Sequence, residues 1–255
     1  MSNLGGLSFE DDNSKKTIYV HLKPDGNMVQ RIKGEEATTV LAMDDHERKI
    51  NKYRTRVLEM GTNKGDLIVE RVFKNIRNVQ LIKIEEKDSF GVRTMVLTFN
   101  NMKDGSPNVC VETPLVNTYG SIGDYAGSFI DLVPNLEIGK FMTFESFMYV
   151  NKSNKEKKGI NILQDSKEIE SAFWNKKTKT EITDQGIKPN AVKTTKLGKE
   201  HWDFSDQAEF LIKIFNKFCI DVDKAFGNEI TESKEANPKE NSQVSQEADT
   251  VDLPF

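Results

Sequence analysis

The sequence predicts a mainly β fold, in the form of an OB-fold-like five-stranded barrel with a helix between the third and fourth strands. Three observations predict it. Short apolar runs are separated by Gly, Pro and Asn turns, one helical pattern interrupts these runs, and a last pair of strands follows the helix. A strand meander, a helix and a final hairpin form the element order of such barrels.

The expected strands begin after a polar lead. A strand over 17–22 turns through Pro24-Asp25-Gly26-Asn27 into a second strand over 28–32. The segment 34–65 is charged and has few apolar side chains, so we expect a long, partly ordered excursion there. Further strands are predicted at 67–73, 78–85, 92–99, 108–115, 141–150 and 159–163.

Two helices are expected. Apolar side chains at helical spacing predict a helix over 118–133, which Pro134 ends. After a basic, irregular stretch over 165–202, Ser205 is suited to cap a helix that ends at Gly227. That helix is expected to pack on the domain or on a second copy of itself through its apolar face, which comprises Leu211, Ile214, Phe215, Phe218 and Val222.

These elements predict four regions. They are a flexible N-terminus (1–16), a binding domain (17–165), a basic extension with the C-terminal helix (166–227) and an acidic tail (228–255). The tail holds seven Asp or Glu against two Lys and few large apolar side chains, so we expect it to be disordered. Residues 1–227 are therefore weakly basic, although the formal net charge of the whole chain is −4.

Basic clusters within residues 1–227 favour a polyanionic partner. Residues 48–56 carry five positive charges and no acid, and further Lys groups lie at 152–158 and 176–199. Aromatic residues stand beside several of these cations, as single-strand binding requires for base stacking and phosphate contact. Candidate contacts are Arg48, Lys52, Tyr53, Arg54, Arg56, Phe73, Lys74, Arg77, Phe90, Arg93, Phe147, Tyr149, Lys152, Lys155, Lys157 and Lys158.

Strand parity refines the prediction for 141–150. Successive side chains alternate between faces, so Met142, Phe144, Met148 and Val150 are expected to face the core. Phe147 and Tyr149 would then face outward with the polar positions.

Cysteine and histidine usage predicts neither a disulfide nor a metal site. Cys110 and Cys219 stand in apolar contexts, which suggests buried thiols in a reducing cytoplasm. The three His residues are isolated, and no Cys or His group has the spacing of metal ligands, so no metal and no cofactor is expected. Residues 1–16 lack the apolar region of a signal peptide, and we expect neither export nor membrane insertion.

The chain from Tyr19 to about Phe173 resembles phage single-stranded-DNA-binding proteins of the OB class. The matching landmarks are Asp25-Gly26 with Arg31-Ile32-Lys33, Val69 to Phe73 leading to Asn78, the hairpin from Ile84 to Gly91, Leu132 to Asn135, and Gly159 to Gln164. The terminal Asp252-Leu253-Pro254-Phe255 is similar to the Asp-(Ile/Leu)-Pro-Phe ending of bacterial and phage members. The family often has Gly where Asn78 stands and Tyr where Phe73 stands.

This resemblance implies a protein without enzymatic activity that coats single-stranded DNA during replication, recombination and repair. It would act in the cytoplasm, in the bacterial host if the chain is phage-encoded. The ring and α-carboxylate of Phe255, with Asp252, Leu253 and Pro254, would bind replication or recombination proteins through a pocket with a basic rim. Homo-oligomers are compatible with this role.

Two other classes remain as alternatives. Asp44-Asp45-His46-Glu47 and Glu85-Glu86-Lys87-Asp88 could supply the carboxylates of a metal-dependent nuclease. OB barrels also bind RNA and proteins, so an RNA-binding or phage structural protein is the second alternative.

Overall fold

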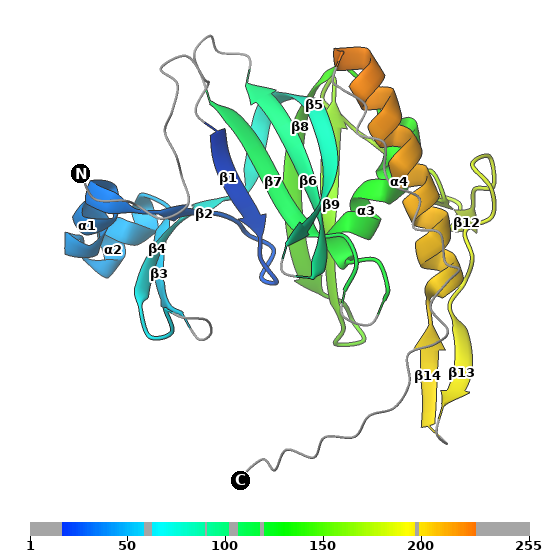
Figure 1. Cartoon of the computed structure of the whole chain (residues 1–255), viewed down its shortest axis with the longest axis horizontal. Coiled ribbons are helices and arrows are strands. Elements are labelled where there is room, and N and C mark those ends of the chain that lie inside the picture. The colour runs from blue at the N-terminus through cyan, green and yellow to red at the C-terminus, as the bar shows by residue number, and fades with distance from the viewer. Residues whose placement is uncertain are drawn as a thin grey trace, which may run out of the picture.

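A computed structural model describes residues 17–58, 63–89, 91–101, 107–117, 120–196 and 199–227. Within these residues the chain is mainly β. Ten of the described strands form one mixed sheet, and four α-helices accompany it (Figure 1).

The large sheet is open, with the strand order β10-β9-β8-β5-β6-β7-β1-β2-β4-β3. Its edge strands β3 and β10 lie at opposite ends of this order. The predicted OB-like five-stranded barrel is therefore wrong, because the described strands form a ten-stranded sheet without closure. The strand bounds are β1 Thr17–Leu22, β2 Met28–Ile32, β3 Tyr53–Val57, β4 Leu67–Phe73, β5 Asn75–Ser89, β6 Val92–Asn101, β7 Asn108–Pro114, β8 Phe141–Val150, β9 Glu156–Gln164 and β10 Lys167–Glu168.

One pairing makes the sheet mixed. Strand β1 runs parallel to β7, from Thr17 opposite Asn108 to His21 opposite Glu112, and antiparallel to β2 on its other side. Strand β1 thus joins the two halves of the sheet. The sequence order of the strands gives no sign of this pairing, which explains why the barrel prediction failed.

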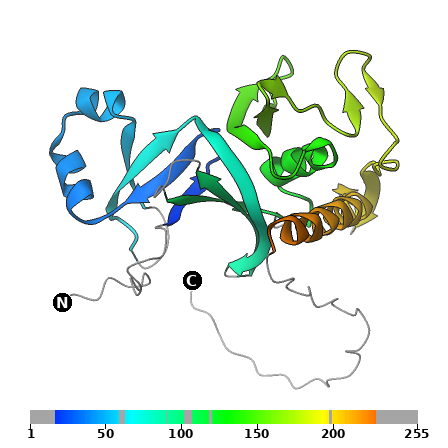
Figure 2. The same cartoon turned by 90° about the horizontal axis from the view of Figure 1, so that it is seen from above.

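Strand β5 is long and bends along its length (Figure 2). Its register shifts between Ile76 and Val79 against β8, and between Leu81 and Lys83 against β6. Asn78 lies in this bend with φ 54°, a left-handed conformation that Gly and Asn adopt at the lowest cost. The bend lets one strand pair with β8 at its start and with β6 along its length.

The segment predicted as a partly ordered excursion contains two short helices, α1 (Gly34–Ala42) and α2 (Asp45–Ile50), followed by β3. Asp44 and Glu47 form a reciprocal capping box at the start of α2. Helix α1 covers a small second core of Ile32, Val40 and Val69. Figure 2 shows these helices at one side of the sheet.

The predicted helix over 118–133 begins later, as α3 (Asp124–Leu132), and a 3-10 turn (Val133–Asn135) follows it. The preceding residues fold back on β7, where the Gly123 N–H donates to the Leu115 carbonyl at 3.0 Å. A Cβ on Gly123 would lie 2.5 Å from the Pro114 carbonyl oxygen. This close return delays the start of the helix.

The C-terminal helix is confirmed as α4 (Ser205–Phe226), with Gly227 left-handed at its end. Its N-cap is Phe204 and not Ser205, whose hydroxyl donates to Asp203 at 2.6 Å. The stretch predicted to be irregular contains two small hairpins, formed by β11 (Trp174–Asn175) with β12 (Thr180–Glu181) and by β13 (Val192–Lys196) with β14 (Lys199–Asp203).

The main core lies between the sheet and helices α3 and α4. Phe129 of α3 meets Phe218 of α4 edge to face at 6.5 Å, so α4 packs on the body of the protein. Cys110 is buried and Cys219 is partly buried, both as free thiols. Among the described residues, no helix combines the length and apolarity that crossing a bilayer requires.

Candidate nucleic-acid interface

A groove of about 640 Å³ collects the basic and aromatic side chains that surround the start of β3 and the end of β4. We call it the basic groove. Its nine lining residues include five cations and two rings and no carboxylate. They are Lys49, Lys52, Tyr53, Arg54, Val72, Phe73, Lys74, Asn75 and Arg77.

Local geometry explains how the groove forms. Lys52 follows α2 with φ 61° and turns the chain into β3. Its carbonyl accepts the Val72 N–H at 2.7 Å, which ties this turn to β4. At Lys74 the chain leaves β4 and enters β5, so the end of one strand and the start of the next contribute cations to the same groove.

The two rings of the groove are held differently. The Tyr53 hydroxyl donates to Glu36 at 2.9 Å and accepts from Arg71 at 2.8 Å, while the Arg71 guanidinium lies 5.3 Å from the ring centroid. These contacts fix the orientation of the Tyr53 ring. Phe73 is partly buried and also packs against the main core, so its ring contributes both to stability and to the groove.

A second, shallow hollow of about 540 Å³ lies beside the basic groove. We call it the Lys23 cleft; it is lined by Lys23, Pro24, Asp25, Arg54, Thr55 and Arg56. Arg54 lines both the cleft and the basic groove, so the two hollows are neighbours.

Glu70 lies against the cleft and is only 2% exposed. It accepts from Arg54 Nε at 2.7 Å and from Arg56 Nε at 2.9 Å, each with a different carboxylate oxygen. Burial opposes ionisation of Glu70, but these two hydrogen bonds outweigh it and hold its pKa below the usual range. Glu70 is therefore a buried carboxylate that stays charged.

The hairpin of β8 and β9 carries a second aromatic pair. Phe147 and Tyr149 stack with ring centroids 6.0 Å apart, and Tyr149 is 56% exposed. Lys157 lies opposite Tyr149 in the register, while Lys152 and Lys155 lie in the exposed hairpin turn. Lys158 instead pairs with Glu156 at 2.9 Å.

The parity prediction for β8 is confirmed in part. Met142 and Phe144 are buried, whereas Val150 is 55% exposed because it lies at the end of the hairpin. Met148 is only partly buried.

Two contacts connect the β8–β9 hairpin with the groove and the cleft. Asn75, which lines the basic groove, donates to Glu145 at 3.3 Å, and Glu145 shares a strand face with Phe147 and Tyr149. The Ser146 hydroxyl donates to the Gly26 carbonyl at 2.7 Å. A Cβ on Gly26 would lie 2.7 Å from the Met148 nitrogen, so the turn that carries Lys23 packs directly on β8.

Arg48 and Arg93 lie outside the groove. Arg48 donates to the Met43 carbonyl at 2.7 Å and also to the Val40 and Leu41 carbonyls, which cap α1, and it pairs with Asp45. Arg93 pairs with Glu86 on the sheet near the other end of β5. Phe90 lies outside the described residues, as does the terminal motif Asp252 to Phe255.

The structure thus brings six predicted residues into the basic groove: Lys52, Tyr53, Arg54, Phe73, Lys74 and Arg77. The prediction missed Lys49, Asn75, Lys23 and Glu70. The signal for Lys49 was present, because it belongs to the basic run 48–56. Lys23 lies between β1 and β2 and Glu70 lies on β4, so only the pairing of β2 with β4 brings them together.

The acidic motifs considered for metal catalysis have other partners. Asp44 and Glu47 cap α2, and Asp45 pairs with Arg48. Glu85 pairs with Lys83 and Lys87, and Glu86 with Arg93. Within the described part of the chain, no group of three or more His, Cys, Asp or Glu is arranged to hold a metal ion.

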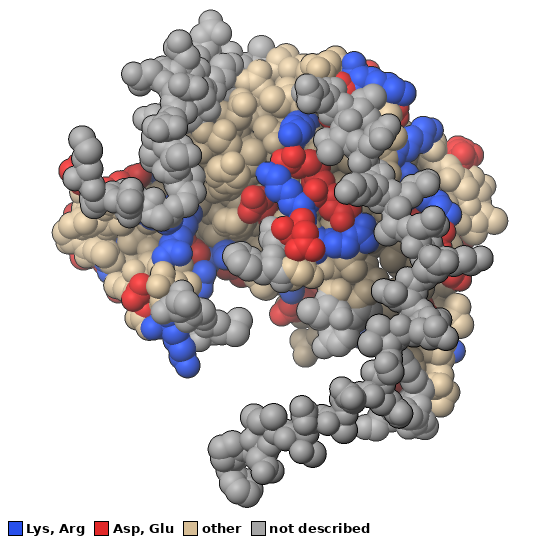
Figure 3. Space-filling view, in the orientation of Figure 1, with Lys and Arg blue, Asp and Glu red and all other residues tan. Residues whose placement is uncertain are grey.

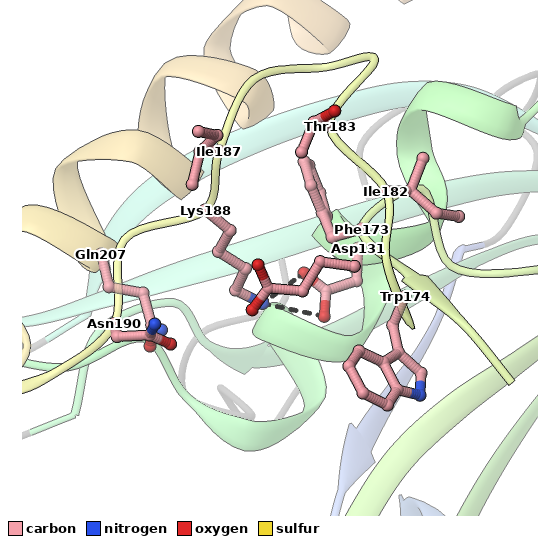
Figure 4. A pocket seen from close by; sticks show the side chains of 10 residues that line it. Asp131, Phe173, Trp174, Ile182, Thr183, Ile187, Lys188, Asn190 and Gln207 are labelled. Carbon is pink, nitrogen blue, oxygen red and sulfur yellow. Dashed lines mark hydrogen bonds and ion pairs between the residues drawn. The ribbon is translucent and has the colours of Figure 1, made fainter. Parts of the chain in front are cut away.

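Charged side chains are spread unevenly over the face drawn in Figure 3. On this face, acidic and basic side chains interleave over the middle of the sheet, and several basic side chains with fewer acidic ones occupy the region of β3 and β4. A smaller pocket of about 190 Å³ between α3 and the 173–190 segment contains a matched ion pair, with Lys188 2.6 Å from Asp131 (Figure 4). Its cation is therefore already neutralised.

Comparison with known proteins adds no relatives. No protein-family model matches the chain, and neither a curated protein nor a solved structure shows significant similarity to it.

Proposed function

We propose that the protein binds single-stranded DNA in the basic groove without reading its sequence. One observation carries this proposal: five cations and the rings of Tyr53 and Phe73 converge on a groove lined by no carboxylate. Cations that follow phosphates and rings that stack on bases are the two requirements for such binding. The Phe147–Tyr149 pair would extend the stacking surface onto the β8–β9 hairpin.

An unpaired strand fits this surface better than a duplex does. Rings that line a groove can stack only on bases whose faces are free, and a duplex hides those faces. Nothing in the proposed contacts requires a 2′-hydroxyl, so a strand of DNA can make all of them. The protein would cover single strands exposed in replication, recombination and repair.

We also propose that the acidic tail acts in this function, although it lies outside the described residues. Its seven acids against two Lys would compete with DNA for the groove. DNA binding would displace the tail and free the ring and carboxylate of Phe255 for a replication or recombination protein.

Fluorescence anisotropy of a labelled oligothymidylate tests the central claim, with poly(dT), poly(U) and duplex DNA as competitors. We expect poly(dT) to compete best. Trp174 and Trp202 are not suitable reporters, because both lie on the small hairpins and neither lines the groove. Failure of the wild-type protein to bind oligothymidylate at low salt would refute the proposal.

A matched pair of variants locates the site. Lys52→Asn removes a groove cation while keeping a residue type that tolerates the left-handed backbone at this position. Lys140→Ala removes a cation that pairs with Glu137 and Asp165 outside the groove. We expect only the first to weaken binding, by about fivefold at 0.1 M salt if one phosphate contact is lost.

A further inference from the structure

The Lys23 cleft has the charge and geometry of a phosphate site. Lys23, Arg54 and Arg56 line it, and the acids in contact with them are Asp25 and Glu70. Three cations against two carboxylates leave one positive charge, which matches the single negative charge of a phosphodiester. Because Arg54 also lines the basic groove, a strand in that groove can reach the cleft without leaving the surface.

The arginines are held so that part of each guanidinium stays available. Arg56 uses Nε for Glu70, and among the described residues Glu70 is the only acceptor it contacts. Arg54 uses Nε for Glu70 and Nη1 for Asp25 at 2.5 Å. The remaining Nη donors can bind phosphate oxygens, which the fork of a guanidinium fits well.

Glu70 is the residue that fixes this arrangement. It is directly opposite Arg54 in the β3–β4 register, and its buried carboxylate receives both Nε groups. Without that carboxylate, two long cationic side chains would repel each other and sample many rotamers.

We propose that the Lys23 cleft binds a phosphodiester of the same single strand, and that Glu70 is a positioning residue that orients Arg54 and Arg56 toward it. This inference rests on the proposed function. It makes an unusual prediction about sign: removing a negative charge from a polyanion-binding surface should weaken binding. Simple electrostatics predicts the opposite.

Glu70→Gln tests the positioning role. The amide keeps one acceptor but turns an NH₂ donor toward an Nε–H donor, so one arginine loses its orientation. Glu85→Gln is the matched control, because Glu85 also pairs with two cations, Lys83 and Lys87, outside the groove and cleft. Oligothymidylate binding is measured over a salt series, together with thermal unfolding of each variant.

We expect Glu70→Gln to bind about fivefold more weakly at 0.1 M salt, with a salt slope smaller by about 0.7, as the loss of one single-strand phosphate contact predicts. Glu85→Gln should bind as tightly as wild type or slightly more tightly. A folded Glu70→Gln protein that binds as well as or better than wild type would overturn the positioning role.

Lys23→Ala and Arg56→Ala test the cleft itself and leave Glu70 in place, so they decide the matter if Glu70→Gln does not fold. The Lys23 and Arg56 side chains are 27% and 40% exposed. Each variant should lose about fivefold in affinity at 0.1 M salt. If both bind like wild type while Lys52→Asn is weakened, the cleft proposal falls and the proposed function stands. If the wild-type protein itself does not bind, both are refuted.

Discussion

Arg54 and Glu70 face each other across the β3–β4 register with Nε 2.7 Å from a carboxylate oxygen that is almost completely shielded from water. A second arginine, Arg56, contacts the other oxygen of the same carboxylate. Removing one partner of a buried ion pair leaves the other charge buried without a partner. This destabilises the fold by more than the intact pair stabilises it. The stability of this corner of the sheet and its capacity to bind anions are therefore coupled.

This coupling predicts a dependence of stability on pH. Because the folded-state pKa of Glu70 is lowered, its contribution is complete above the unfolded-state pKa and is lost as the pH falls through the folded-state value. At neutral pH, Glu70→Gln should be less stable by about 3 kcal/mol. Urea unfolding should show that the difference in the free energy of unfolding between wild type and Glu70→Gln becomes smaller as the pH falls below about 4. A gap that stays constant down to that range would contradict the prediction.

The exposed ring of Tyr149 should contribute to binding and not to folding. Tyr149→Ala is expected to cost about 1–3 kcal/mol of oligothymidylate affinity, because a base can stack on its ring. The unfolding temperature should stay close to that of wild type. Tyr19→Ala is the control, since Tyr19 is 43% exposed on β1 and does not line the groove. Equal affinities of the two variants would contradict a stacking role.

Phe73→Ala should behave differently from Tyr149→Ala. Its ring lines the groove and also packs on the main core, so truncation should lower both affinity and the free energy of unfolding. The expected loss of affinity is about 1–3 kcal/mol if the ring stacks on a base. Chemical unfolding and anisotropy on the same preparation separate the two effects, and a loss of stability alone would show that Phe73 serves only the core.

Arg48 and Lys49 are neighbours in one basic run, but their replacement by Ala should affect different properties of the protein. Arg48 donates to carbonyls at the end of α1, so Arg48→Ala is expected to cost about 1 kcal/mol of stability and to leave affinity unchanged. Lys49 lines the groove, so Lys49→Ala should weaken binding and leave stability unchanged. Urea unfolding and anisotropy of both variants test this difference. If Arg48→Ala reduced affinity in a folded protein and Lys49→Ala did not, the roles assigned to these two residues would be wrong.

Deletion of 228–255 tests the role of the tail. The truncated protein should bind oligothymidylate more tightly, because a competing polyanion is removed, with little change in the salt slope. Capture of replication or recombination proteins should be lost, while deletion of Phe255 alone should leave DNA binding intact. Unchanged DNA affinity together with intact partner capture would rule out this role.

The sequence predicted most strands because their signals are local. Alternating side chains and turn residues marked β1, β2, β4 and β8 with the bounds that the structure shows. It did not predict the open sheet, since pairing between distant strands leaves no local trace. Helix α2 was missed although its capping box, Asp44 with Glu47, is visible in the sequence. Its apolar pattern is too short to reveal a helix.

The sequence indicated some residues of the candidate groove and missed others for related reasons. A ring beside a cation in the sequence identified Tyr53 and Phe73, because the neighbours in the chain also line the groove. Charge alone could not distinguish a free cation from one that caps a helix, as Arg48 does, or one that pairs with an acid, as Arg93 does. Nor could it indicate Glu70, whose role depends on cross-strand register.

The parallel β1–β7 pair has a consequence for synthesis of the chain. Residues 17 and 108 are partners 91 positions apart, and contacts over such separations form slowly. Every groove residue is translated before β7 exists, so a growing chain that lacks β7 cannot yet complete the sheet that supports the groove. We therefore expect ribosome-bound fragments that end before β7 to be protease-sensitive and unable to retain DNA.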